Sequence, residues 1–538
     1  MRLENITIGQ VLLQRLKTMA DENAFEYRDA FYTWRDLDEL SDVFAVKLLK
    51  CGIKYDTHVA IWGGNTPNWI ITYVALAKIG AVSVLINPRY KEEELAKTFE
   101  YSDVEYVCYG DCCSNSKNII DHLNDRNIGK VKEYMYMGKN EHYREGRAQI
   151  LKNLNPSDME NLKKAENKVT PQHIASIVFT SGTTSFPKGV MLTHYQLVNI
   201  SREAVEQMKW ETGDRMCMSV PLFHCFGLST GFLASLRVGF CIYLLPELHT
   251  SCILKCIHKY KITILNGVPT IFLALLSNPE RRKYDLSSLK SGIIAGSKVF
   301  KEDYLKICKE LKFKKLQQSY GQTETSPCVT FNGYDDSMNI KCISVGKVIP
   351  NVKIKIVSTK DGHDLGPYES GEILVKGFNV MKGYYKCTRQ NCEKVKDGWL
   401  YTGDIGYVDN CENLYITGRK KDIIIRSGEN ISPVEIEEAI LRYPGVLQVK
   451  VFGIPVPVVQ EEIAACIVAE NGKLDVDGLV RYLKKHIADY KVPKYIYIFK
   501  KFPMNLNGKV NVKQLKKEVQ WKVSKEEDYD FNRTASTD

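Results

Sequence analysis

The amino-acid sequence predicts an α/β fold, with a large N-terminal domain of doubly wound sheets, a small β-rich subdomain and a small α+β C-terminal domain. In the first part of the chain, short apolar runs alternate with stretches of helical periodicity, as in parallel strands joined by helices. From about residue 340 the apolar runs are shorter and turn residues separate them, which favours a β-rich subdomain. A chain of 538 residues, 44% of them hydrophobic, can build two or more cores.

The first strand–helix–strand unit is expected at residues 58–86, where HVAIWG and AVSVLI flank the helical run NWIITYVALAKIG. Residues 110–170 are polar and are expected to form surface helices and loops. A second series of strands is expected in IASIVF, CIYLLP, ITILNGVP and SGIIAGS, which begin at residues 174, 241, 262 and 291. Ligands of doubly wound sheets bind at the carboxyl ends of the strands, so the loop after IASIVF is a candidate site.

The C-terminal part is expected to form a compact α+β unit. Ser432-Pro433-Val434-Glu435 has the spacing of a capping box with proline at the first helical position, which predicts a helix to about Tyr443. Strands are expected in VLQVKVFG, EEIAACIV and KYIYIF, and a helix near residues 474–488. The charged tail lacks apolar periodicity, which predicts disorder.

The stretch FTSGTTSFPKGVMLTH, from Phe179 to His194, predicts a phosphate-binding loop. Its hydroxyl groups, backbone N–H groups and single ammonium group are what a polyphosphate requires. The spacing differs from the Walker pattern GxxxxGK[ST], because the fifth residue after Gly182 is Pro187 and a glycine follows Lys188. Composition alone leaves a plain Ser/Thr/Gly-rich surface loop as the alternative.

Charge and cysteine content narrow the function classes. The net charge of +10 is spread over 74 basic and 64 acidic residues without a long basic block, so nucleic acid is not an expected partner. The sixteen cysteines include no CxxC pair and no zinc-type cluster. No segment reaches the ~18 uninterrupted apolar residues of a membrane span, so no transmembrane segment is expected. Without a secretory leader, the expected location is cytoplasmic.

Four further motifs follow the phosphate loop: SYGQTETSP (319–327), GWLYTGD (398–404), GRKKDIIIRSGENISPVEIE (418–437) and PMNLNGKV (503–510). Together with TSGTTSFPKGV, in this order and at these separations, they resemble the adenylate-forming superfamily of acyl-CoA synthetases, luciferases and peptide-synthetase adenylation domains. The resemblance covers roughly residues 5–520. Within the superfamily, IAGS followed by YGQTETSPCVTF and SVGKVIPN is most similar to medium-chain and long-chain fatty acyl-CoA ligases.

The resemblance implies an AMP-forming acid–thiol ligase. A carboxylic acid, expected to be a fatty acid, would react with ATP and Mg²⁺ to give an acyl-adenylate, and the acyl group would pass to CoA with release of AMP and pyrophosphate. The nearest alternative is an enzyme that loads the phosphopantetheine thiol of a carrier protein, an interpretation that a carrier domain within this sequence would favour. A catalytically weak binding or regulatory homologue is a third interpretation.

The resemblance also implies an ATP site drawn from several motifs. The loop from Thr180 to Lys188 would hold the β- and γ-phosphates, and Tyr320 would stack on adenine. Glu324 would hold Mg²⁺, a hard ion that prefers carboxylate and phosphate oxygens. The complete expected ATP set is Thr180, Ser181, Gly182, Thr183, Thr184, Lys188, Gly296, Ser297, Tyr320, Gly321, Thr323, Asp404, Arg419 and Lys509.

The catalytic set implied by the resemblance is Lys509, Thr323, Glu324 and His224. The Lys509 ammonium would neutralise charge that develops on the carboxylate and α-phosphate oxygens. His224, in PLFHCFG, would lie near the acyl carboxylate, with a buried core histidine as the alternative; His194 is assigned no catalytic role. The expected acyl pocket is His224, Gly227, Gly267, Val268 and Ala295, whose small and apolar members would leave room for a flexible chain.

The second half-reaction implies a rotation of the C-terminal domain about Lys421, which withdraws Lys509. The rotation would present Ser427, Gly428 and Glu429 to the pantetheine arm of CoA. The expected divisions are an N-terminal adenylation domain at 1–418, a hinge at 419–423, the mobile C-terminal domain at 424–522 and a disordered tail at 523–538.

Two departures from the family pattern concern function. Ser185 stands where the family usually has glycine, and a serine held at positive φ would strain the loop by about 1 kcal/mol or more. Val456 and Gln460 stand where relatives often have aspartate and glycine, on the surface expected to lie near CoA.

Overall fold

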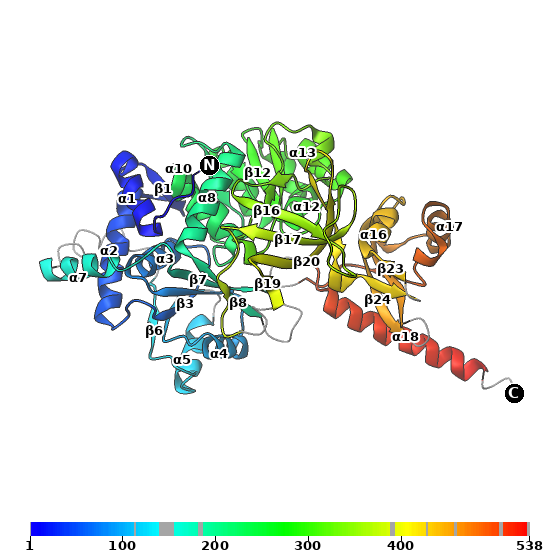
Figure 1. The fold of residues 1–538 in the computed structure, drawn as a ribbon, viewed down its shortest axis with the longest axis horizontal. Coiled ribbons are helices and arrows are strands. Elements are labelled where there is room, and N and C mark those ends of the chain that lie inside the picture. The colour runs from blue at the N-terminus through cyan, green and yellow to red at the C-terminus, as the bar shows by residue number, and fades with distance from the viewer. Residues whose placement is uncertain are drawn as a thin grey trace. The chain divides into compact units, whose positions relative to one another are not determined.

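The fold is that of a computed structural model, which describes residues 2–111, 115–138, 155–180, 187–387, 393–426, 429–456, 460–504 and 509–534. The chain forms two compact units, and Figure 1 labels many of the elements of both. The first contains Met1–Ile354 and Val375–Leu400, and the second contains Lys355–Leu374 and Tyr401–Asp538. The domain boundaries expected at residues 418 and 423 stay a prediction.

A seven-stranded sheet in the first unit contains the expected strand–helix–strand motif. Its helix α3 (Pro67–Ile79) is buried along its whole length, begins after the capping residue Thr66 and ends at Gly80, whose φ of 71° favours glycine. The five strands from β7 to β6 run parallel, and β8 and β18 add antiparallel neighbours. In spatial order the strands are β18 (Gly383–Tyr384), β8 (Lys188–Thr193), β7 (Ile174–Thr180), β4 (Val82–Ile86), β3 (His58–Trp62), β5 (Tyr106–Tyr109) and β6 (Glu133–Tyr136).

A nine-stranded sheet forms the other layer of strands in the first unit. Its six central strands, from β13 to β1, are parallel, and antiparallel strands flank them at both edges. In spatial order the strands are β15 (Lys347–Val348), β14 (Thr330–Phe331), β13 (Lys315–Tyr320), β12 (Ser291–Ala295), β11 (Ile264–Leu265), β9 (Arg215–Met218), β10 (Cys241–Leu244), β1 (Asn23–Tyr27) and β2 (Ala30–Thr33).

The run IASIVF does not belong to the series in which the sequence placed it. It forms β7, which pairs in parallel with β4 of the first motif, with Ser83 opposite Ser176. The strands expected after it, β10, β11 and β12, all lie in the nine-stranded sheet. Periodicity identifies a strand, but the choice of a distant partner depends on tertiary packing, so this grouping was wrong.

Helices cover these sheets, and their apolar faces supply two buried clusters around Phe272 and Phe99. The region 110–170 contains surface helices, as expected, and also the edge strand β6. The remaining helices of the first unit are α1 (Ile8–Met19), α2 (Trp34–Lys50), α4 (Glu92–Tyr101), α5 (Ser116–Asp125), α7 (Pro156–Glu166), α8 (His194–Met208), α9 (Cys225–Gly227), the π-helix η1 (Leu228–Leu233), α10 (Ala234–Val238), α11 (Thr250–Tyr260), α12 (Pro269–Ser277), η2 (Pro279–Lys283), α13 (Lys301–Glu310), η3 (Thr323–Thr325) and α14 (Met338–Lys341).

The expected β-rich subdomain is a five-stranded sheet. VKIKIV, GEILVKG and the GWLYTGD segment each supply one strand, in the order β16-β17-β20-β19 with β21 paired to β20. The strands are β16 (Val352–Val357), β17 (Gly371–Gly377), β19 (Val395–Lys396), β20 (Trp399–Val408) and β21 (Leu414–Arg419).

The C-terminal α+β part lies in the second unit. Strand β26 (Tyr495–Phe499) pairs in parallel with β25 (Gln460–Ala469), and its two faces pack against different apolar clusters. Helix α17 (Val476–His486) contributes to one cluster and helix α18 (Val512–Thr534) to the other. The other elements are η4 (Lys420–Asp422), β22 (Ile424–Arg426), β23 (Glu429–Ile431), α16 (Pro433–Leu441), β24 (Val446–Val456), η5 (Glu470–Gly472) and η6 (Asp489–Lys491).

One local expectation differs from the structure. Helix α16 starts at Pro433 as expected, but Ser432 makes no capping hydrogen bond; its hydroxyl donates to the Thr417 carbonyl at 2.9 Å, and Glu435 accepts from Lys491 at 2.6 Å. Tertiary partners therefore replace the expected capping box. Helix α18 covers Val512–Thr534, and the disordered tail expected at 523–538 stays a prediction.

A buried cation joins helices α2 and α3. The Lys78 side chain is only 3% exposed, and its ammonium group lies 2.7 Å from Asp38 and also contacts Asp42, one turn further along α2. Desolvation raises the pKa of the Asp42 carboxyl. Each charge in this group is tolerated because the others are present.

Lys78→Met should cost about 3 kcal/mol of stability at neutral pH, because two desolvated carboxylates lose their cation. The loss should shrink as the pH falls and the Asp42 carboxyl, whose pKa burial raises, becomes protonated. Urea midpoints at pH 7 and pH 5 measure both effects. Lys50→Met is the matched control, since Lys50 is 58% exposed beside Asp158 and should cost no more than about 1 kcal/mol. Equal losses in the two variants would contradict this account.

Candidate active site

The phosphate-loop motif connects two antiparallel strands of the first unit, β7 and β8, which together are called the phosphate hairpin. Thr180 ends β7, Lys188 begins β8, and the two residues are paired. Ser181, Gly182, Thr183, Thr184 and Ser185 lie outside the described residues. A strand follows Lys188, whereas a helix follows the lysine of a Walker loop, which agrees with the different spacing. Thr180 stands at the carboxyl end of a parallel strand, where α/β sheets bind ligands.

The residues expected around adenine follow two adjacent parallel strands. Gly296 and Ser297 come directly after β12, and Tyr320 is the last residue of β13. Ala295 is paired with Ser319, so the loops leave the sheet at the same edge. Gly296 has a φ of 89°, a conformation that favours glycine. Both segments are therefore positioned to contact one ligand.

Thr323 and Glu324 lie in a tight turn, η3, just after β13. Gly321 has to be glycine there, because a Cβ atom would lie 1.6 Å from the carbonyl oxygen of Pro327. The backbone N–H of Met381 donates to the Glu324 carbonyl at 2.9 Å. The Cys225 thiol contacts the Thr323 hydroxyl at 3.6 Å, which brings the PLFHCFG motif next to the YGQTE motif.

Tyr384 joins the phosphate hairpin to this turn. Its hydroxyl donates to Glu324 Oε1 at 2.7 Å, and the Lys188 ammonium group lies 4.9 Å from the centre of its ring. Burial and the nearby Glu324 charge raise the pKa of the Tyr384 hydroxyl far above its usual range, so it is a donor at neutral pH. Sequence analysis did not single out Tyr384. No motif spacing links it to Glu324, sixty residues earlier.

His224 precedes the short helix α9, is partly exposed, and packs on Phe223 with a ring separation of 4.3 Å. Gly267 and Ala295 come together because the Ala295 N–H donates to the Gly267 carbonyl at 3.2 Å. Val268 precedes helix α12 and is partly exposed. His194, in contrast, is fully buried; burial lowers its pKa to about 3, and its ring accepts from the Ile8 N–H.

The small residues of the expected acyl pocket are small for a local reason. A Cβ atom on Gly227 would lie 2.1 Å from the carbonyl oxygen of Pro221, and one on Gly267 would lie 3.0 Å from the ring of Phe272. Backbone and side chains of the protein already fill those spaces. The lack of a side chain at Gly227 and Gly267 therefore leaves no extra space for an acid at these two positions.

Asn266 lies in the stretch 266–270 expected to line the acyl pocket but was given no role of its own, and it holds three of these segments together. It is 1% exposed; its side chain donates to the Thr230 carbonyl in η1 at 3.2 Å and accepts from the Ile293 N–H in β12 at 2.9 Å. Its own carbonyl accepts from the Ser219 hydroxyl. A lone asparagine in an apolar run gave no signal beyond its polarity.

The expected ribose site lies in the second unit. Asp404 on β20 and Arg419 on β21 are paired across the sheet and form an ion pair at 2.9 Å. The Asp404 side chain is 6% exposed. On the same sheet, Glu372 accepts from the Gly403 N–H at 3.1 Å and from the Lys420 ammonium group at 2.8 Å. These contacts fix the segment GWLYTGD relative to the start of η4.

The remaining expected residues also belong to the second unit. Lys421 lies in η4 and is exposed. Ser427 and Gly428 lie outside the described residues, and Glu429 begins β23. Lys509 is exposed and lies next to Val510, which forms a β-bridge with Met504. Val456 and Gln460, the two residues that differ from the family pattern, are paired: Val456 is the last residue of β24 and Gln460 is the first residue of β25.

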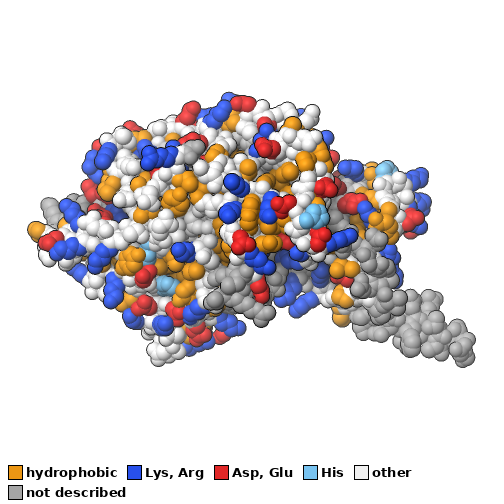
Figure 2. Space-filling model, in the orientation of Figure 1, with side chains coloured by type: hydrophobic (Ala, Val, Ile, Leu, Met, Phe, Trp, Pro, Cys, Tyr) orange, Lys and Arg blue, Asp and Glu red, His pale blue; other side chains and the backbone are white. Residues whose placement is uncertain are grey.

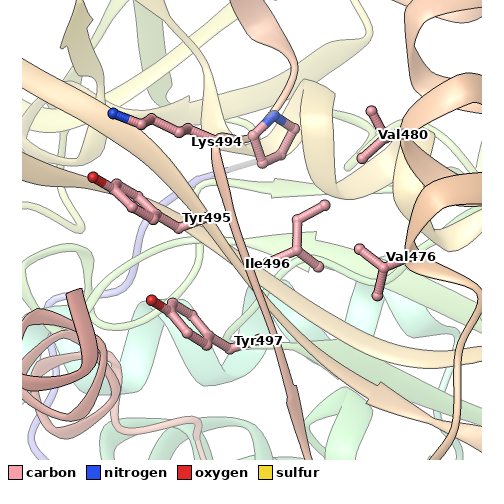
Figure 3. Close-up of a pocket in the computed structure, with 7 residues that line it drawn as sticks. Val476, Val480, Lys494, Tyr495, Ile496 and Tyr497 are labelled. Carbon is pink, nitrogen blue, oxygen red and sulfur yellow. The ribbon is translucent and has the colours of Figure 1, made fainter. Parts of the chain in front are cut away.

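A small hollow of about 250 Å³ lies elsewhere in the second unit. Figure 3 shows Ile496 directed toward Val476 and Val480, while Tyr495 and Tyr497 point to the other face of the strand. None of its lining residues is an expected substrate contact. On the face in Figure 2, basic and acidic side chains are interspersed, so no patch of one sign gathers there. Among the described residues, none of the helices has the length and apolar character that a membrane crossing requires.

Comparison with known proteins identifies the family. The family model described as AMP-binding enzyme matches residues 13–385, and that of the AMP-binding enzyme C-terminal domain matches residues 435–509. The chain therefore belongs to the AMP-binding enzyme family. The resemblance to the adenylate-forming superfamily and the predicted fold class are confirmed.

Curated relatives match nearly the whole chain. The YngI protein of Bacillus subtilis (strain 168) is 36% identical over 532 residues, 95% of this chain and 97% of that protein. The long-chain-fatty-acid–CoA ligase of the same organism is 33% identical over 542 residues, 96% and 95% of the two chains. The mitochondrial medium-chain acyl-CoA ligase ACSF2 of Danio rerio is 30% identical over 560 residues, 96% and 89% of the two chains. The predicted enzyme class, an AMP-forming acid–CoA ligase, is confirmed.

Solved structures have the same fold. ATP-bound MatB from Rhodopseudomonas palustris superposes with a TM-score of 0.83 at 24% identity, over 96% of this chain and 99% of that one. The o-succinylbenzoate CoA synthetase MenE of Bacillus subtilis, in complex with its acyl-adenylate intermediate OSB-AMP, has a TM-score of 0.78 at 27% identity, over 96% and 99% of the chains.

Gly227→Ala should cost about 1–3 kcal/mol, because the added methyl group meets the Pro221 carbonyl. A lower urea midpoint measures the loss. Gly213→Ala is the control, since nothing lies within 4 Å of a Cβ atom there. If Gly227→Ala were as stable as Gly213→Ala and instead rejected longer acids, the space at Gly227 would belong to the substrate.

Proposed function

We propose that this chain is an ATP-dependent acyl-CoA synthetase that activates a fatty acid through an acyl-adenylate and transfers the acyl group to CoA. AMP and pyrophosphate are the other products. The observation that carries the proposal is the network in the first unit. There, Tyr384 contacts both Lys188, at the end of the phosphate hairpin, and Glu324, in the turn after β13. The Lys188 cation can bind phosphate oxygens and the Glu324 carboxylate can bind a metal ion, so together they suit a metal-bound polyphosphate.

The first half-reaction brings two anions together. A carboxylate oxygen of the acid attacks the α-phosphorus of ATP, a new P–O bond forms, and the bond to pyrophosphate breaks. Repulsion between the anions is the main obstacle, so positive charge and hydrogen-bond donors are the main requirement. In this proposal the hairpin and Lys188 hold the β- and γ-phosphates, Thr323 donates near the α-phosphate, and the Lys509 ammonium offsets the developing charge.

The residues present fit Mg²⁺ that arrives with ATP. Mg²⁺ usually binds proteins through one or two carboxylates and completes its shell with phosphate oxygens and water. Glu324 supplies such a carboxylate, and the described residues contain no cluster of three or more His, Cys, Asp or Glu side chains that would form a complete metal cage. When bound, Mg²⁺ offsets negative charge on the phosphates.

The nucleoside is proposed to bind at the edge where β12 and β13 end, with Tyr320 against the adenine and the backbone of Gly296 and Ser297 beside it. Parallel pairing of these strands supports this placement. Asp404 would accept the ribose hydroxyls, and the ion pair with Arg419 orients its carboxylate.

The acid is proposed to be aliphatic. The curated relatives include a long-chain and a medium-chain acyl-CoA ligase. His224 lies beside Cys225, which contacts Thr323, so the acid carboxylate would enter next to the α-phosphate. Asn266, which ties η1 to β12, would fix the walls of the acyl pocket.

The second half-reaction is attack of the CoA thiol on the acyl carbon, with AMP as the leaving group. A pivot at Lys421 would withdraw Lys509 and bring Ser427, Gly428 and Glu429 to the pantetheine arm. Lys421 lies in the short element η4 between β21 and β22, and a pivot of this kind needs only a few residues that absorb a backbone change. None of the described cysteines forms a disulfide, as is usual for proteins of the proposed cytoplasmic location.

One incubation tests the proposal. The protein is mixed with ATP, Mg²⁺ and a set of aliphatic and aromatic acids, with and without CoA, and the products are read by mass spectrometry. Acyl-CoA with stoichiometric AMP is expected, and its acyl group identifies the preferred acid. An acyl-adenylate that persists despite CoA would favour a carrier-protein loader. No AMP from any acid would contradict the proposal.

Lys509→Ala should abolish adenylate formation and spare thioester formation from acyl-adenylate that is supplied ready-made, because the lysine acts only on the first step. AMP release and acyl-CoA formation, measured separately, check the two steps. Lys513→Ala, an exposed lysine one turn further along the chain, should leave both unchanged. Equal loss of both steps in Lys509→Ala would contradict the assigned role.

A further inference from the structure

We propose that Tyr384 is a positioning residue for metal-bound ATP: its hydroxyl fixes one oxygen of the Glu324 carboxylate, and its ring holds the Lys188 ammonium group. The inference rests on the proposed function, because Glu324 and Lys188 are its proposed metal and phosphate contacts.

The backbone of Tyr384 is tied to the phosphate hairpin. Tyr384 is paired with Val190 on β8, two residues after Lys188. On either side of it, the Tyr385 N–H donates to the Gly189 carbonyl at 2.8 Å and the Lys382 N–H donates to the Met191 carbonyl at 3.0 Å. Any displacement of the hairpin strand β8 therefore moves the Tyr384 ring with it.

The Tyr384 side chain reaches from the hairpin to the turn that follows β13. It is 2% exposed, and its hydroxyl meets Glu324 Oε1 at 2.7 Å. Just before β18, the Met381 N–H donates to the Glu324 carbonyl at 2.9 Å. Both the backbone and the side chain of Glu324 are thus held by the segment that also holds β8. These contacts couple the seven-stranded and nine-stranded sheets at the proposed phosphate site.

The chemistry of a carboxylate explains why this contact would matter. A hydrogen bond to Oε1 fixes the rotation of the carboxylate and directs its second oxygen, so that a metal ion meets an oriented ligand. Outer partners of metal ligands commonly change metal affinity 10–100-fold when they are removed. The aromatic ring attracts the Lys188 ammonium without neutralising it, so the full positive charge remains available to the phosphates.

Tyr385 provides a matched control in the next position. Its hydroxyl donates to the Asp103 carboxylate at 2.7 Å, so Tyr385→Phe also removes a tyrosine–carboxylate hydrogen bond from β18 and its flank. Asp103 is not among the proposed substrate contacts. A difference in metal binding between the two phenylalanine variants is therefore due to the contact with Glu324 and not to the loss of a tyrosine–carboxylate hydrogen bond in general.

The test measures binding of Mn²⁺ in the presence of ATP by electron paramagnetic resonance, with wild type, Tyr384→Phe and Tyr385→Phe in the full-length chain. Tyr384→Phe should weaken Mn²⁺ binding about tenfold, raise the Mg²⁺ concentration needed for AMP formation by a similar factor, and leave the KM for the acid unchanged. Tyr385→Phe should match wild type. Thermal melts establish that both variants are folded.

A second variant tests the contact with Lys188. Tyr384→Leu removes the ring as well as the hydroxyl, and it should raise the KM for ATP above that of Tyr384→Phe. Equal KM values for the two variants would overturn the role of the ring. Wild-type affinity in Tyr384→Phe, or an equal loss in Tyr385→Phe, would overturn the role of the hydroxyl while the proposed function stands. If wild type itself bound no Mn²⁺ with ATP, both proposals would fail.

Discussion

The site depends on a constraint of parallel sheets: strands that run together also end together. β12 and β13 are adjacent and parallel, so Gly296 and Tyr320 leave the sheet at one edge although they are far apart in sequence. β7 ends in the other sheet, at Thr180. Without a connection, the phosphate hairpin and the YGQTE turn would be positioned independently. The short strand β18 supplies that connection through Tyr384.

In the second unit, too, strand pairing brings together residues that are distant in sequence, but there the strands are antiparallel. Asp404 and Arg419 lie opposite each other on β20 and β21, so the pairing register sets the ion pair. Glu372, on the neighbouring strand β17, contacts Gly403, which precedes Asp404, and Lys420, which follows Arg419. The proposed rotation would need such preformed local groups, because only then would a rigid movement deliver a complete set of contacts.

The sequence was sufficient for features that depend on local pattern and on ordered motifs. Apolar runs identified most strands, and five motifs in order identified the family. It was insufficient where a distant partner decides the outcome. Ser432 has the pattern of a helix cap but donates to Thr417, and IASIVF reads as part of the later series but pairs with β4. The small residue Gly227 suggested room for an acyl chain, whereas the Pro221 carbonyl occupies the space where a side chain of residue 227 would lie.

Tyr384 and Asn266 show the same limit within the site. Each acts through hydrogen bonds to segments distant in sequence, and neither lies in a pattern that composition or periodicity could distinguish. Motifs locate the groups that meet a substrate. The groups that hold them in place become visible only in the packed structure.

The most direct test of an acyl-adenylate is exchange of labelled pyrophosphate into ATP without CoA. The account predicts exchange that requires both the acid and Mg²⁺, because adenylation is reversible and precedes thiol attack. Exchange that appeared only when CoA was added, or ADP as the nucleotide product, would contradict it.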